Sequence, residues 1–114
     1  MPGDFDLVMD MYRDGMTDEF VSHARRCLKE KTLSEAEAAA IAKLLPTFKF
    51  RSLAQANQVV CLVYLNRIGA TEEILAQETG LPADLITKAV AGKSYSMKVA
   101  EAVLKVLDAR GGDG

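Results

Sequence analysis

The sequence predicts an all-α protein, a compact helical domain of about seven helices. Apolar residues recur at helical spacing along the chain, and no segment shows the strict alternation of a half-buried strand. Nearly half of the 114 residues are hydrophobic, but tryptophan is absent and aromatic residues make up only 6%. We therefore expect an aliphatic, alanine-rich core in one domain, or in one small domain with a helical extension.

The first three helices are predicted from apolar spacing and from residues that start and stop helices. One apolar face, followed by Gly15, predicts the first helix: Phe5, Val8, Met9 and Tyr12. Thr17 is expected to cap a second helix, whose apolar face comprises Phe20, Val21, Ala24, Cys27 and Leu28. Ser34 and Glu37 form a capping box for a third helix over residues 35–45, which Pro46 stops.

A long helix is predicted after a short linker at residues 47–51. Ser52 and Gln55 form a second capping box, and Gly69 terminates this helix after about Arg67. Its continuous apolar run would also suit a short buried strand, but the capping box and the glycine favour a helix. We expect it to be the central and most buried element.

Three shorter helices complete the prediction. Thr71 is placed to cap a helix over residues 72–79, and Gly80 turns the chain into a helix over residues 83–91. Gly92 ends that helix. Ser96 can cap a last helix that runs from Met97 to about Arg110, and the glycine-rich residues 111–114 are expected to be a disordered tail.

Catalytic and metal-binding patterns are missing from the sequence. Cys27 and Cys61 lie within helical patterns without metal-ligand spacing, so we expect buried free thiols in a reducing cytosol. His23 has no second ligand or catalytic partner close in sequence, which is typical of a surface or boundary histidine. There is no glycine-rich phosphate loop. We expect no enzymatic activity, no cofactor and no metal site.

No segment of the sequence indicates a membrane protein. Residues 1–10 are acidic and lack the basic and apolar regions of a signal peptide. The longest apolar run, residues 59–65, is far too short to cross a bilayer. We therefore expect a soluble, cytoplasmic protein without a membrane partner.

Residues 72–91 have the pattern of two helices that cross at a steep angle. Ala76 supplies a small side chain where the axes come closest, and Gly80 suits a left-handed turn residue. Apolar residues at the right spacing fill the wedge between the helices: Leu75, Leu81, Ile86 and Ala89.

This stretch resembles the helix-turn-helix of the lambda-repressor-like family, which includes phage repressors and LacI-type regulators. Ala76, Gly80 and Ile86 match the family's recurrent alanine, glycine and Ile/Val positions. The sequence Ala91-Gly92-Lys93 is similar to the end of a family recognition helix, and residues 96–107 resemble the helix that follows it. The resemblance covers about residues 53–109.

The resemblance implies a regulator of transcription that inserts helix 83–91 into the major groove of double-stranded DNA. Matched position by position, its base-reading residues would be Ala83, Asp84, Thr87 and Lys88. Its contacts to the DNA backbone would come from Lys93, Ser94, Tyr95 and Lys98. The chain carries a net charge of −2, yet the segment from Asp84 to Lys105 holds four lysines against two acids, a local net of +2.

The resemblance divides the chain into a DNA-binding unit at residues 49–110 and an N-terminal segment at residues 1–48. Nothing in residues 1–48 matches the family, so we expect three helices that serve self-association, as in a homodimer, or that grip a protein partner. The alternative function is a protein-interaction adaptor, such as an antirepressor or a polymerase-associated factor, that keeps the fold without reading DNA. Asp84 favours this alternative, because a carboxylate repels phosphate.

Overall fold

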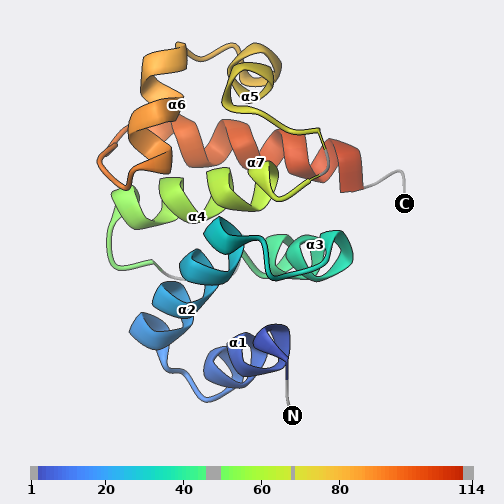
Figure 1. The fold of residues 1–114 in the computed structure, drawn as a ribbon. Coiled ribbons are helices and arrows are strands. Elements are labelled where there is room, and N and C mark those ends of the chain that lie inside the picture. The colour runs from blue at the N-terminus through green and yellow to red at the C-terminus, as the bar shows by residue number, and fades with distance from the viewer. Residues whose placement is uncertain (1–2, 46–49, 68, 112–114) are drawn as a thin grey trace.

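The computed structural model describes residues 3–45, 50–67 and 69–111, and within these ranges the chain is all-α, as predicted. The described residues form seven helices and no strand (Figure 1). The helices are α1 (Asp4–Arg13), α2 (Thr17–Glu30), α3 (Glu35–Leu44), α4 (Leu53–Leu65), α5 (Glu72–Thr79), α6 (Ala83–Val90) and α7 (Met97–Gly111). None of them is long and apolar enough to cross a membrane. Pro46, most of the predicted linker, and residues 112–114 of the predicted tail lie outside the described ranges.

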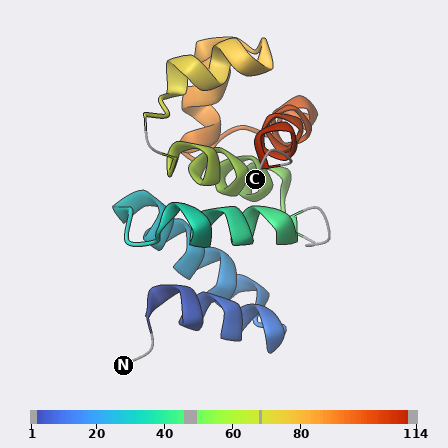
Figure 2. The ribbon, with the colours of Figure 1, turned by 90° about the vertical axis from the view of Figure 1, so that its right-hand side faces the viewer.

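The described residues form a molecule that measures 40 × 29 × 23 Å. α1 lies at one end, α5 and α6 lie at the other, and α4 and α7 run side by side between them (Figure 1, Figure 2). α4 packs against α2, α3, α6 and α7, whereas α1 packs mainly against α2. α4 is thus the shared centre of the fold, and α1 is peripheral.

α4 is the most buried helix, as its apolar run predicts. Ten of its residues are buried, Ala54 and the nine residues 56–64. The alternative of a buried strand is wrong for this segment, and the helix ends at Leu65 rather than at Arg67. The core is continuous across the two predicted parts of the chain, because Phe20 and Ile41 belong to the same buried cluster as Val59 and Ile86.

The predicted helix caps are correct at some positions and wrong at others. Ser34 and Glu37 form the complete capping box of α3, since each backbone N–H donates to the other residue's side chain. Ser52 accepts from the Gln55 N–H at 3.2 Å, but the Gln55 side chain accepts from the N–H of Arg51 instead of returning the bond. Thr17 does not cap α2: it is the first helical residue, and the N-cap, Met16, makes no side-chain hydrogen bond there.

Candidate nucleic-acid interface

α5, α6 and the three residues between them form the region predicted to face DNA. The Ile74 N–H donates to Thr71 Oγ1 at 3.2 Å, which confirms Thr71 as the cap of α5. Gly80 is left-handed, with a φ of 73°, and its N–H donates to the Ala76 carbonyl at 2.9 Å. Because glycine alone adopts this conformation at little cost, Gly80 defines where α5 ends and the chain turns.

The side chains of α5 and α6 that face the core are aliphatic, and two of them are alanines. Leu75, Ile86 and Ala89 are fully buried, and Ala76 is 9% exposed. Leu81, in the turn, is half-buried and packs against the core. α6 also packs on α4, and α5 also packs on α7, so both helices are anchored to the centre of the fold.

The outer side of α6 carries all four predicted base-reading residues. Ala83, Asp84, Thr87 and Lys88 are exposed, and their spacing of i, i+1, i+4 and i+5 places them on one face of the helix. Ile86 and Ala89, which point into the core, occupy the opposite face. The fold therefore presents a continuous, solvent-facing stripe of α6, which we call the α6 outer face.

The charge of the α6 outer face changes sign along the helix. Thr87 donates its hydroxyl to Glu72 Oε1 at 3.0 Å, which brings a carboxylate from the start of α5 against α6. Asp84, in the first turn of α6, is exposed, while Lys88 lies in the last turn, followed by the exposed Lys93. Asp84 makes the beginning of the face acidic, and Lys88 and Lys93 make its end basic, but Glu72 adds a second carboxylate at Thr87, directly before Lys88.

The loop from α6 to α7 brings two more of the predicted residues to the surface. The Lys93 N–H donates to the Lys88 carbonyl at 2.9 Å across Gly92, which is left-handed with a φ of 78°. Lys93 is exposed, and Tyr95 is 71% exposed. Both residues follow the basic end of the α6 outer face in the chain.

Ser94 does not fit its predicted role as a phosphate contact. The residue is only 4% exposed, its carbonyl accepts from Asn57 Nδ2 at 2.9 Å, and its hydroxyl accepts from the Ser96 N–H at 3.3 Å. Sequence position placed it between two exposed residues, but the loop turns its side chain inward. Ser94 therefore holds the loop in shape.

Asn57 holds the loop and the start of α7 from inside the core. This fully buried residue of α4 donates to the carbonyls of Ser94 and Ser96, at 2.9 and 3.0 Å, and accepts from the Ala100 N–H at 2.9 Å. Three directional bonds from one side chain leave the loop little freedom. Asn57 is not among the residues predicted from the sequence to belong to the site, although a polar residue in so apolar a helix is a signal of such a role.

Gln58, the next residue of α4, holds the other end of the same loop. Its Nε2 donates to the Val90 carbonyl at 3.0 Å, and its Oε1 accepts from Arg25 Nη1 at 2.8 Å. A Cβ placed on Gly92 would lie 3.0 Å from Gln58 Oε1, so Gly92 is also required for close approach. Through Gln58, the end of α6 is joined to α2.

Lys98 lies apart from the other predicted phosphate contacts. It is exposed near the start of α7, where its N–H donates to Ser96 Oγ at 3.3 Å, so Ser96 caps α7 as predicted. Its side chain lines an open groove between α5 and α7, together with Glu78, Glu101 and Lys105. The two glutamates reduce the positive potential around Lys98, which makes it a weaker candidate for phosphate than Lys93.

Searches against protein-family models, curated proteins and solved structures find no match for this chain.

Proposed function

We propose that the protein is a sequence-specific, DNA-binding transcriptional regulator whose helix α6 enters the major groove. The observation that carries this proposal is the α6 outer face, an exposed stripe backed by a buried one and followed by Lys93 and Tyr95. An α-helix with one exposed face and a basic end is an element that a major groove accommodates.

In the proposed mechanism, side chains of the α6 outer face read base edges. Lys88 donates to the O6 and N7 acceptors of guanine, and Asp84 accepts from the N4 amino group of cytosine. Thr87 donates its hydroxyl proton to Glu72, so its oxygen accepts from a base amino group. Lys93 and the Tyr95 hydroxyl bind phosphates and set the position of α6 in the groove. Asn57 and Gln58 hold the loop in one conformation, so little ordering of the backbone is needed on binding.

A single unit of this size makes few contacts with DNA, so the regulator is proposed to act as a dimer or with a protein partner. The N-terminal helices are the proposed place of association. Leu7 and Met16, of α1 and the turn that follows it, are apolar residues at the surface of this end, 37% and 41% exposed.

The test measures affinity for selected and scrambled duplexes by fluorescence anisotropy at several salt concentrations. Lys88→Ala is expected to weaken binding to the selected duplex by about 1–3 kcal/mol and to reduce its advantage over the scrambled one. Lys93→Ala is expected to weaken both equally and to lower the slope of log affinity against log salt by about one unit. Lys43→Ala, at an exposed lysine of α3, is the matched control and should change neither quantity.

A second function, a protein-interaction adaptor, is favoured by one observation. The Glu72–Thr87 hydrogen bond places a carboxylate beside a proposed base-reading residue, and Asp84 adds another on the same face. Carboxylates there repel the DNA backbone and suit a basic protein partner. Equal affinity for both duplexes, unchanged by Lys88→Ala, would reject sequence-specific reading in favour of the adaptor.

A further inference from the structure

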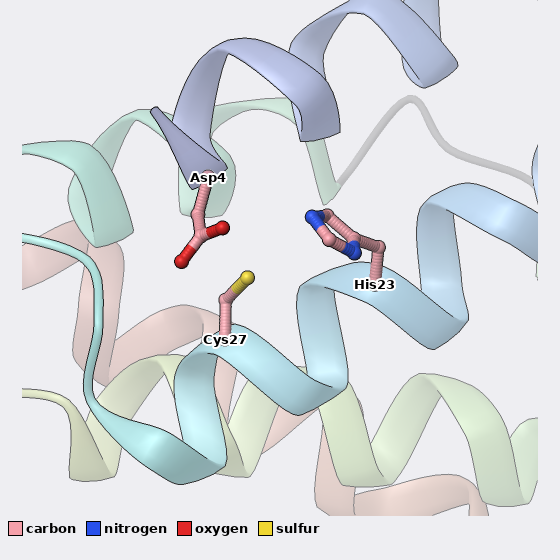
Figure 3. A group of neighbouring side chains, drawn as sticks. All are labelled: Asp4, His23 and Cys27. Atoms are coloured by element: carbon pink, nitrogen blue, oxygen red, sulfur yellow. The ribbon is translucent and has the colours of Figure 1, made fainter. Parts of the chain in front are cut away.

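Three side chains that bind transition metals meet where α1 begins and α2 runs past it. Asp4 is the first residue of α1, and His23 and Cys27 are one turn apart on α2, so both point to the same side of that helix (Figure 3). Each side chain offers one ligand atom, and these atoms all lie within 4.8 Å of one another. The residues described by the structure contain no other group of three such side chains.

We propose that Asp4, His23 and Cys27 bind a zinc ion that fastens the start of α1 to the middle of α2. This inference is independent of the proposed DNA-binding function, since the site lies at the opposite end of the molecule from α5 and α6 (Figure 1).

The donor set selects the metal. A thiolate, an imidazole and a carboxylate are all common zinc ligands, while the soft sulfur argues against calcium and magnesium. Zinc bonds of about 2.0–2.3 Å place two ligand atoms about 3.5 Å apart in a tetrahedral site. A spacing of up to 4.8 Å therefore requires the side chains to close in by about 1 Å on binding. Asp4 and His23 are only half-buried, so they have room for this movement.

An unsatisfied nitrogen of His23 is the second, independent observation. His23 Nε2 is buried and has no hydrogen-bond partner among the described residues, which is uncommon for a buried polar atom. The other ring nitrogen, Nδ1, lies 2.7 Å from Arg26 Nη2 and is already occupied. Nε2 is therefore the nitrogen left for the metal.

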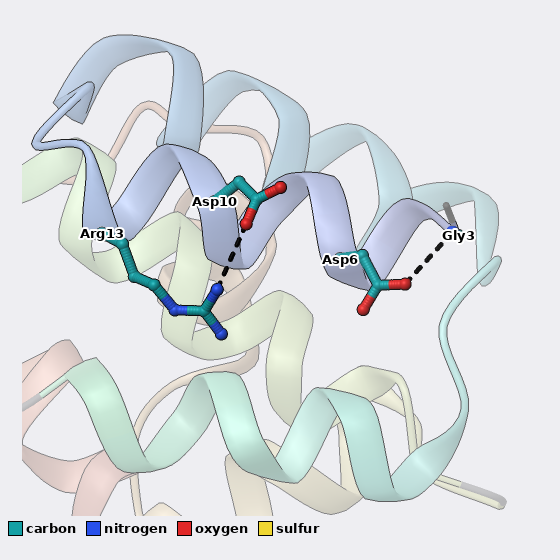
Figure 4. A network of polar contacts seen from close by, with 4 residues as sticks. All are labelled: Gly3, Asp6, Asp10 and Arg13. Atoms are coloured by element: carbon teal, nitrogen blue, oxygen red, sulfur yellow. Dashed lines mark hydrogen bonds and ion pairs between the residues drawn. The ribbon is translucent and has the colours of Figure 1, made fainter. Parts of the chain in front are cut away.

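The acidic residues of α1 differ in whether their carboxylates have a partner. Asp6 accepts from the Gly3 N–H at 3.4 Å, and Asp10 forms an ion pair with Arg13 at 3.2 Å (Figure 4). Asp4 forms no hydrogen bond or ion pair with the residues that the structure describes, and its carboxyl group faces Cys27 (Figure 3). Among the acidic residues of α1, Asp4 is therefore the one available to bind a metal ion together with the His23 and Cys27 side chains of α2.

Metal binding changes the protonation of Cys27 and of His23. The metal ion takes the Cys27 sulfur as a thiolate, so the S–H proton leaves to solvent as the sulfur–metal bond forms. Metal on His23 Nε2 places the ring proton on Nδ1, so the exposed Arg26 must turn away.

The test uses the full chain, reduced and stripped of metal, and titrates it with Co²⁺ as a spectroscopic probe. We expect a thiolate-to-cobalt charge-transfer absorption, which Zn²⁺ then removes by competition. Cys27→Ala should abolish this absorption, whereas Cys61→Ala, at the other buried free cysteine, should retain it. His23→Gln and Asp4→Asn should each weaken cobalt binding at least about 10-fold, and the matched control Asp6→Asn should not.

Arg26→Ala gives a further test. It removes the guanidinium that lies against His23 Nδ1, so cobalt binding should be equal to that of the native chain or tighter. Circular dichroism establishes that each variant is folded; if Cys27→Ala is not, the His23 and Asp4 variants decide. The proposal is overturned if the native chain shows no thiolate absorption with cobalt. It is equally overturned if the absorption survives in folded Cys27→Ala, or if Asp4→Asn and Asp6→Asn bind alike.

Discussion

The α1–α2 hairpin, residues 4–30, and the α6–α7 loop, residues 91–96, are held in place by different forces. Apolar packing holds the hairpin: Val8 and Phe20 are fully buried, and the rings of Tyr12 and Phe20 lie 5.5 Å apart. The loop is held by hydrogen bonds from two buried side chains of α4, Asn57 and Gln58. Apolar contacts are non-directional, whereas hydrogen bonds fix both distance and angle.

This difference agrees with the functions proposed for the two regions. A loop that presents Lys93 and Tyr95 to a regular lattice of phosphates must keep one shape, and directional bonds provide it. In the hairpin, the hydrogen bonds to Gln58 and Asn66 are made by Arg25 and Leu28, which both lie on α2. A metal ion at Asp4, His23 and Cys27 would add a directional link between α1 and α2.

Asn57→Ala is expected to have the largest effect on stability. It leaves two carbonyls and one N–H of the α6–α7 region without their partner, at a cost of about 3 kcal/mol. Asn66 is the matched control, because its Nδ2 donates to the Leu28 carbonyl at 3.0 Å and so joins the end of α4 to α2. Asn66→Ala should cost about 1 kcal/mol. Urea unfolding measures both, and equal losses would contradict the special role of Asn57.

Gly92→Ala should destabilise the protein more than Gly15→Ala, although both glycines are left-handed, with φ of 78° and 73°. Each substitution costs about 1–2 kcal/mol for the backbone conformation. At Gly92 the new methyl group also meets the buried Gln58 side chain at 3.0 Å, whereas nothing lies within 4 Å at Gly15. We expect a difference of about 1 kcal/mol in thermal or urea unfolding. A larger loss at Gly15 would show that the hairpin, not the loop, is the more constrained region.

Thr71→Ala and Thr17→Ala compare a true cap with a threonine that only resembles one. Thr71 Oγ1 accepts the Ile74 N–H, so its loss should cost about 1 kcal/mol. Thr17 is inside α2 and caps nothing, and its substitution should stay within about 0.5 kcal/mol. The free energies of unfolding in urea distinguish the two variants. A larger loss of stability for Thr17→Ala than for Thr71→Ala would show that Thr17 caps α2 after all.

Cys61 should give the smallest effect, seen only at alkaline pH. Desolvation in α4, with a contribution from the charge of Glu72, raises its pKa from 9.0 to about 12. Since the folded pKa lies above the unfolded one, the stabilisation is complete below about pH 9 and is lost as the pH rises towards 12. At pH 9.5 the loss should be about 0.8 kcal/mol. The free energy of unfolding measured at pH 7 and at pH 9.5 checks this loss. Cys61→Ala, which removes this thiol and keeps Cys27, should lose less stability between the two pH values.

Several helix boundaries could be predicted from the sequence alone, because they depend on residues that are close together in the chain. The start of α3 follows from Ser34 and Glu37, and the end of α5 follows from Gly80, because caps and left-handed turns involve residues only a few positions apart. The burial of α4 was also predictable, since its apolar residues cover every side of the helix. The exposed positions of Ala83, Asp84, Thr87 and Lys88 follow from the same periodicity on α6.

The tertiary structure decided the features that depend on residues far apart in the chain. Ser94 is buried because Asn57, 37 positions earlier, binds its carbonyl, and Thr87 is paired because Glu72 begins the neighbouring helix. Asp4 reaches His23 and Cys27 only after the turn at Gly15 folds α1 back onto α2. Helical periodicity assigns a residue to a face, but the partner it meets there depends on how the helices pack, and a single sequence does not encode that packing in any local pattern.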